Sequence, residues 1–67
     1  MEQMMRQLIN DVFNDLEHAI EGTDEVLDAE ILADVLGDRM YDMSEEYRNT
    51  PWKDRRALAL QIAGEYV

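Results

Sequence analysis

The feature that most constrains the fold is the regular recurrence of apolar side chains along the first third of the chain. From residue 4 to residue 20, apolar residues return at three- and four-residue spacings: Met4, Met5, Leu8, Ile9, Val12, Phe13, Leu16, Ala19 and Ile20. Residues with this spacing share one face of an α-helix. The pattern therefore predicts an amphipathic helix over residues 4–20.

A second apolar segment begins soon after Gly22, the residue that follows the first pattern. Glycine readily adopts the left-handed conformation that ends a helix, and Thr23 is a suitable cap for the next one. Asp24 and Glu25 would then lie in its first turn. The apolar residues of this segment cover most of a helix circumference: Val26, Leu27, Ala29, Ile31, Leu32, Ala33, Val35 and Leu36. We therefore predict a central helix that contacts neighbours on two sides.

The length of the central helix depends on Gly37. Glycine inside a helix costs about 1 kcal/mol relative to alanine, yet it is often tolerated there. The apolar phase continues across the glycine, at Leu32, Leu36, Met40, Met43 and Tyr47. We therefore predict one long helix over residues 24–48, and a kink or split at Gly37 is the alternative.

The last helix is predicted to start at the only proline. The residue before a proline avoids helical angles, whereas Thr50 is a suitable cap and Pro51 a suitable first helical residue. This helix is expected over residues 51–66. One apolar stripe holds Trp52, Ala59, Ile62, Ala63 and Tyr66, and an adjoining one holds Ala57, Leu60, Gly64 and Val67.

These elements predict an all-α fold. Residues 1–67 are expected to form a single acidic helical domain, a small three-helix antiparallel bundle, or four helices if the chain splits at Gly37. A chain this short buries a limited core, so a homodimer that completes the core is one expected arrangement. The absence of cysteine, of a leader pattern and of about 18 consecutive apolar residues favours a cytoplasmic protein without a membrane partner.

The charge of the chain is strongly negative and unevenly distributed. Sixteen acidic and six basic residues give a formal net charge of −10. The net charge is −4 over residues 1–22, −7 over residues 23–50 and +1 over residues 51–67. Negative charge repels phosphate backbones and anionic lipids and attracts basic proteins. We therefore expect a basic protein as partner and no direct binding of nucleic acid.

The acids of the central segment are ordered as well as numerous. Glu30, Asp34, Asp38 and Asp42 follow one another at four-residue steps, which stack them about 6 Å apart along a helix axis. Like charges at this spacing destabilise a helix by roughly 0.2–0.5 kcal/mol each. The predicted partner-binding surface comprises these four residues with Asp24, Asp28, Glu45 and Glu46.

Two functions fit this acidic surface. In the first, the carboxylates mimic phosphates and occupy the basic, nucleic-acid-binding site of a partner, as some phage-encoded inhibitors do in a host cytoplasm. In the second, the acids serve solubility only, and the chain is a self-associating structural or regulatory helical module. Contacts with another copy or a partner are expected from Met4, Met5, Trp52, Arg55, Arg56, Leu60 and Val67. Arg55 and Arg56 have a competing role, which is to neutralise acids of the central helix.

One short segment resembles a known DNA-binding motif. Residues 32–37, Leu-Ala-Asp-Val-Leu-Gly, resemble the first helix and turn of a helix-turn-helix DNA reader. Such a reader needs basic and amide side chains on the following helix. Residues 38–46 instead carry four acids and the single base Arg39. A helical core with a kink at Gly37 is therefore the expected structure.

The sequence offers little for catalysis or for a cofactor. His18 is the only histidine, and Asp15 alone stands at a spacing suited to sharing a metal with it. Ser44 is the only serine and has no histidine near it in sequence, and the chain has no glycine-rich phosphate loop. We therefore expect no enzyme activity, no metal site and no cofactor.

Overall fold

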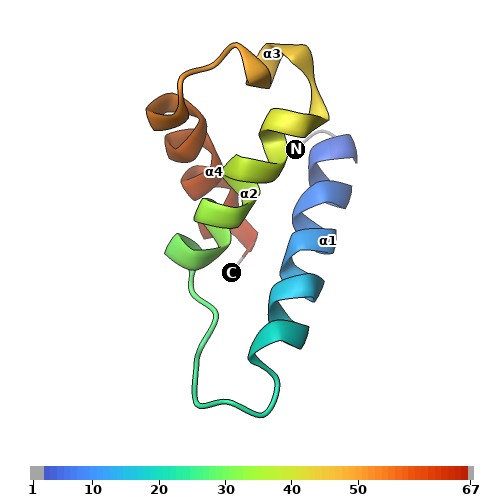
Figure 1. Cartoon of the computed structure of the whole chain (residues 1–67), viewed down its shortest axis with the longest axis vertical. Helices are drawn as coiled ribbons and strands as arrows, with labels where there is room; N and C mark the ends of the chain where they lie inside the picture. The colour runs from blue at the N-terminus through green and yellow to red at the C-terminus, as the bar shows by residue number, and fades with distance from the viewer. Residues whose placement is uncertain (1–2, 67) are drawn as a thin grey trace.

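The computed structural model describes residues 3–66, which form four α-helices (Figure 1). The helices are α1 (Gln3–Ile20), α2 (Ala29–Met43), α3 (Glu45–Arg48) and α4 (Trp52–Tyr66). No strand occurs among these residues. The predicted all-α fold is therefore confirmed, with three long helices and one short turn of helix.

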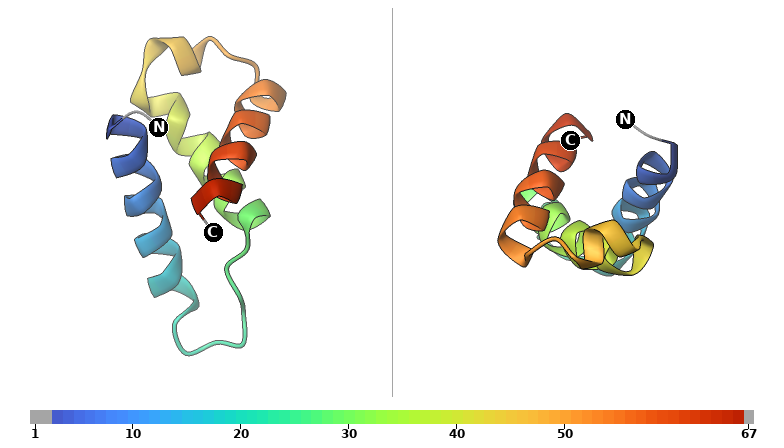
Figure 2. Two further views of the ribbon diagram at one scale, coloured as in Figure 1. Left: turned by 180° about the vertical axis from the view of Figure 1, so that it is seen from behind. Right: turned by 90° about the horizontal axis from the view of Figure 1, so that it is seen from above.

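The long helices are arranged around α2. This helix packs against both α1 and α4, whereas α1 and α4 make few contacts with each other. Viewed from above, α1 and α4 stand on opposite sides of α2 like the arms of a U (Figure 2). The predicted central position of the second helix is therefore confirmed.

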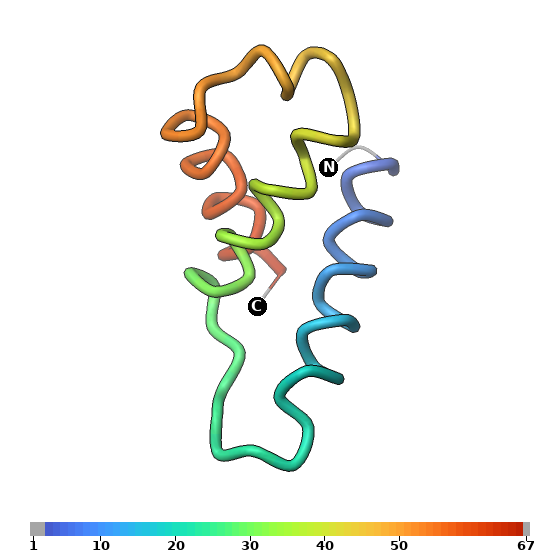
Figure 3. Tube along the Cα trace, in the orientation of Figure 1, coloured from blue at the N-terminus to red at the C-terminus, as the bar shows by residue number. Residues whose placement is uncertain are grey.

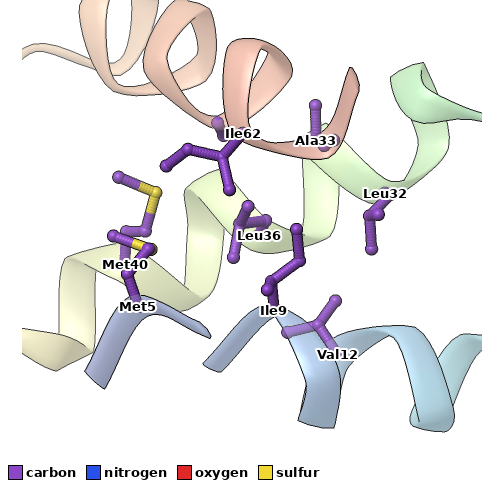
Figure 4. Packing of buried hydrophobic residues seen from close by; sticks show 10 residues of the cluster. Met5, Ile9, Val12, Leu32, Ala33, Leu36, Met40 and Ile62 are labelled. Atoms are coloured by element: carbon purple, nitrogen blue, oxygen red, sulfur yellow. The ribbon is translucent and has the colours of Figure 1, made fainter. Parts of the chain in front are cut away.

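The core lies on the inner side of α2, where the three long helices meet. The buried side chains are Met5, Ile9 and Val12 of α1, Leu32, Ala33, Leu36 and Met40 of α2, and Ala59, Ile62 and Ala63 of α4. Figure 4 shows the labelled members of this cluster gathered between the helices. Full burial of a large aliphatic side chain contributes about 1.5–3 kcal/mol, so these few residues account for much of the stability.

The predicted start of the central helix at Asp24 is wrong. Residues 21–28 form an extended connection below the helices (Figure 3), and α2 begins at Ala29. Asp28 is the cap, and its Oδ1 accepts a hydrogen bond from the Ile31 amide at 2.9 Å. The Thr23 hydroxyl instead donates to the Ile20 carbonyl and so belongs to the turn that ends α1. Of the two apolar residues in the connection, Val26 is 78% exposed and Leu27 packs only partly against the core, so little packing favours an earlier start.

The predicted end of the central helix at Arg48 is also wrong. The helix passes through Gly37 without a break, as the apolar phase indicates, but it ends at Met43. Ser44 has an extended backbone, and its hydroxyl accepts a hydrogen bond from the Tyr47 amide at 3.3 Å, which starts α3. Residues 3–66 therefore form four helices, and the division falls at Ser44 rather than at Gly37. Tyr47 still packs partly against the core.

The remaining boundaries lie close to those predicted. Gly22 has a φ angle of +83°, which is the left-handed conformation expected after α1. The last helix begins at Trp52, and the Pro51 carbonyl accepts the Arg55 amide at 2.9 Å. Among residues 3–66, no helix combines the length and apolar character that a bilayer crossing demands.

Candidate partner-binding surface

Four carboxylates follow the outward face of α2. Glu30, Asp34, Asp38 and Asp42 are all exposed, while the opposite face of the helix is buried in the core. Each four-residue step turns about 40° around the axis, so the row winds gently from the α4 side of the helix to the α1 side. We call these four residues the acidic ridge.

One member of the acidic ridge is neutralised by the chain itself. Nε of Arg56 on α4 lies 2.6 Å from Oδ1 of Asp34, in a hydrogen-bonded ion pair. This bond raises the pKa of the Arg56 guanidinium above its ordinary value, and the nearby charge of Glu30 acts in the same direction. Arg56 thus binds an acid of its own central helix. Glu30, Asp38 and Asp42 make no ion pair within residues 3–66.

The other acids of the predicted surface lie on different elements. Asp24 and Asp28 belong to the connection between α1 and α2, where Asp28 already caps α2. Glu45 and Glu46 form the first turn of α3. All four are exposed, but the ordered row is confined to the acidic ridge.

Arg55 is buried inside its own chain, which differs from the expected role as a partner contact. Its side chain is 8% exposed, Nε donates to the Gly37 carbonyl at 2.7 Å, and Nη1 donates to the Thr50 carbonyl at 2.9 Å. Its guanidinium carbon lies 5.2 Å from the ring centroids of both Tyr41 and Trp52. Arg55 therefore joins the start of α4 to the middle of α2, and no pattern in the sequence marks it as buried.

The remaining predicted contact residues divide between surface and core. Met4 is 59% exposed and Trp52 is 44% exposed, so both present apolar surface. Met5 is 3% exposed and lies in the core, and Leu60 is partly buried against the core. Val67 lies outside the described residues.

A groove between α1 and the end of α2 was not foreseen from the sequence. Met4 and Leu8 of α1 and Met43 of α2 supply its apolar lining. Gln7, Asp11, Arg39 and Asp42 supply its polar lining, and its volume is about 410 Å³. Asp42 therefore belongs to both the acidic ridge and the groove. Of its lining residues, only Met4 and Asp42 are among the contact residues predicted from the sequence.

A second hollow lies where α1 approaches the end of α4. It has a volume of about 570 Å³ and is lined by Gln3, Arg6, Gln7, Asn10 and Tyr66. The Tyr66 hydroxyl donates to Oδ1 of Asn10 at 2.8 Å, and its ring centroid lies 5.0 Å from that of Phe13. These contacts hold the end of α4 against α1.

The histidine and its neighbouring acid have separate partners. Nδ1 of His18 lies 3.5 Å from Glu21, whereas Asp15 accepts a hydrogen bond from Arg39 of α2 at 3.4 Å. In the part of the chain described, no three histidine or carboxylate side chains come together as a metal site requires.

No family model, curated protein or solved structure matches this chain.

Proposed function

We propose that this chain is a protein-binding inhibitor whose acidic ridge occupies the basic, nucleic-acid-binding site of a partner protein. The observation that carries the proposal is the exposure of Glu30, Asp38 and Asp42 in a row, without an ion pair among residues 3–66. A solubilising surface has no need for ordered charge of one sign, which costs helix stability. A phage-encoded antagonist in a host cytoplasm is a setting that suits such a protein.

The spacing of the acidic ridge is compatible with a site built for phosphates. Successive carboxylates are about 6 Å apart along the axis, while phosphates on one DNA strand rise about 3.4 Å each. Asp38 and Asp42 therefore offer charges at about every second phosphate, whereas Asp34, between Glu30 and Asp38, is paired with Arg56. Arginine and lysine side chains are long and adaptable, so a basic groove can tolerate this difference.

The alternative is a self-associating helical module. The exposed apolar surface of Met4 and Trp52 favours this second function. Light scattering distinguishes it, because self-association would give a concentration-dependent mass for the isolated protein, and the acidic ridge variants described next would leave that mass unchanged.

Charge reversal on the acidic ridge tests the proposal. Glu30 and Asp38 form no ion pair within the described residues, and Glu30 acts on Arg56 only through its nearby charge, so the double variant Glu30→Lys and Asp38→Lys should keep the fold. The matched control is Glu17→Lys with Glu65→Lys, which makes the same change in net charge at exposed positions on α1 and α4. Circular dichroism checks that both variants keep their helices.

The measurement is capture of partners from a lysate at about 50 and about 200 mM salt, followed by elution with duplex DNA. Wild-type protein and control should capture the same proteins, and both DNA and the higher salt should release them. The ridge variant should capture none of them. Capture that survives the ridge substitutions, or that DNA cannot displace, would rule out mimicry through this surface.

A further inference from the structure

The groove between α1 and α2 joins apolar surface directly to the acidic ridge. Met4 is 59% exposed. Leu8 and Met43 pack against the core on one side, but both are only partly buried and line the groove. Methionine side chains adapt to different partners and are frequent at binding surfaces. A volume of about 410 Å³ lies within the range of about 300–1,000 Å³ typical of ligand pockets. The groove therefore has room for a bulky apolar side chain.

The charged lining of the groove is predominantly anionic. Asp42 makes no ion pair within residues 3–66, and the contact of Asp11 is a 3.1 Å hydrogen bond from the Gln7 amide. Arg39 lines the same groove, but its guanidinium is directed to Asp15 at 3.4 Å. Two carboxylates are thus available to a cation beside the apolar lining.

We propose that this groove binds a basic amphipathic helix of the partner, with one bulky apolar side chain between Met4, Leu8 and Met43. Lysine or arginine side chains of that helix pair with Asp11 and Asp42. The inference rests on the proposed function, because it names the second part of the same binding surface. Helices of this type place apolar and cationic side chains side by side, which the groove and its rim complement.

The two parts of the surface have different physical roles. The acidic ridge attracts the partner over a distance and its contribution weakens as salt screens it. Burial of an apolar side chain in the groove is insensitive to salt and slows dissociation. A complex that uses both therefore loses less affinity with each increment of salt than a complex through the ridge alone, although both weaken.

The probe for this proposal is a synthetic amphipathic peptide of lysine and leucine. A matched peptide in which glutamine replaces every leucine keeps the charge and removes the apolar face. Methyl signals of carbon-13-labelled methionine report the site, because Met4 and Met43 line the groove while Met5 and Met40 are buried. The leucine peptide should shift the Met4 and Met43 signals and leave those of Met5 and Met40 in place.

Two substitutions separate the apolar from the ionic contribution. Met4→Gln keeps the length and helix propensity of the side chain and should weaken the leucine peptide about tenfold, with little effect on the glutamine peptide. Val26→Thr, at an exposed residue of the connection, is the matched control and should not change binding. Asp42→Asn should weaken both peptides.

Three outcomes would overturn the proposal. They are a leucine peptide that does not bind, one that binds without moving the Met4 and Met43 signals, and a Met4→Gln variant that loses a dimer seen by light scattering. The last outcome would identify a second copy as the occupant. None of these results affects the lysate test of the acidic ridge, so failure of the groove and failure of the proposed function remain distinguishable.

Discussion

Among single residues, Gly37 lies where the start of α4 packs directly on α2. A Cβ atom at this position would lie 3.0 Å from Cζ3 of Trp52 and 3.6 Å from the Cα atom of Arg56. Alanine in a helix is ordinarily better than glycine by about 1 kcal/mol, but here the Trp52 ring, which lies beside Arg55, would have to shift by a few tenths of an ångström. We predict that Gly37→Ala lowers the free energy of unfolding by about 1 kcal/mol, measured by urea titration.

Gly64 provides the control for this substitution. It is exposed in α4, and a Cβ atom added there would meet nothing within 4 Å. Gly64→Ala should therefore raise the free energy of unfolding by about 0.5 kcal/mol. Equal stabilisation by both alanines would show that Trp52 does not press on Gly37.

Arg55 is the second residue whose effect on stability is predictable from its contacts. Arg55→Met keeps much of the apolar stem but removes the donors to the Gly37 and Thr50 carbonyls and the charge between the two aromatic rings. Charged hydrogen bonds contribute about 1.5–3 kcal/mol each, so a loss of about 3 kcal/mol is expected in urea unfolding. Lys53→Met, at an exposed neighbour, should cost almost nothing. A similar loss in both variants would contradict the buried role of Arg55.

At the scale of elements, periodicity located helices better than it located their ends. For α1 and α4, apolar spacing and chain breakers coincide, so both were predicted to within a residue. For α2, the sequence pattern predicts Thr23 as the cap, whereas in the structure Asp28 accepts the hydrogen bond from the Ile31 amide. At the end, Tyr47 keeps the apolar phase even though Ser44 interrupts the helix. A pattern of apolar residues indicates which side chains face the core, but it does not show that the helix between them is continuous.

Capping of α2 can be tested by substitution of two acids. Asp28→Ala removes the acceptor of the Ile31 amide and should lower the free energy of unfolding by about 1 kcal/mol. Asp24, in the first turn that the sequence pattern predicts, lies outside α2, so Asp24→Ala should change the free energy of unfolding little. The difference is measured from the urea midpoints of the two variants. A larger loss for Asp24→Ala than for Asp28→Ala would indicate that the helix starts at Asp24.

For the candidate site too, the sequence predicts what lies within one helix but not what forms between helices. Four-residue spacing was sufficient to align the acidic ridge, because its members share one helix. The groove depends on how the first turns of α1 meet the last turn of α2, and the burial of Arg55 depends on how α4 meets α2. Such contacts between separate helices have no local signature in a sequence.

For the molecule as a whole, the excess of negative charge opposes folding. Only the pairs of Arg39 with Asp15 and of Arg56 with Asp34 join arginine to acid among residues 3–66, against a formal net charge of −10. Screening weakens repulsion between exposed carboxylates more than it weakens close pairs. We predict that the urea midpoint rises between about 10 and about 150 mM sodium chloride.

Neutral variants provide the control for the salt effect. Asp38→Asn with Asp42→Asn removes two neighbouring charges of the acidic ridge, so the variant should be more stable at low salt and should respond less to added salt. A midpoint that is independent of salt in the unmodified protein would show that its charges are already balanced.

The extended connection over residues 21–28 links α1 to the other helices, so that α1 associates with them as an attached segment. Because α1 packs mainly on α2, with the Tyr66 contacts of α4 beside it, its binding is favoured by the high effective concentration that the tether imposes. A protease site introduced at the exposed Val26 would convert folding into association of two fragments. The helical content of the cleaved protein would then depend on its dilution.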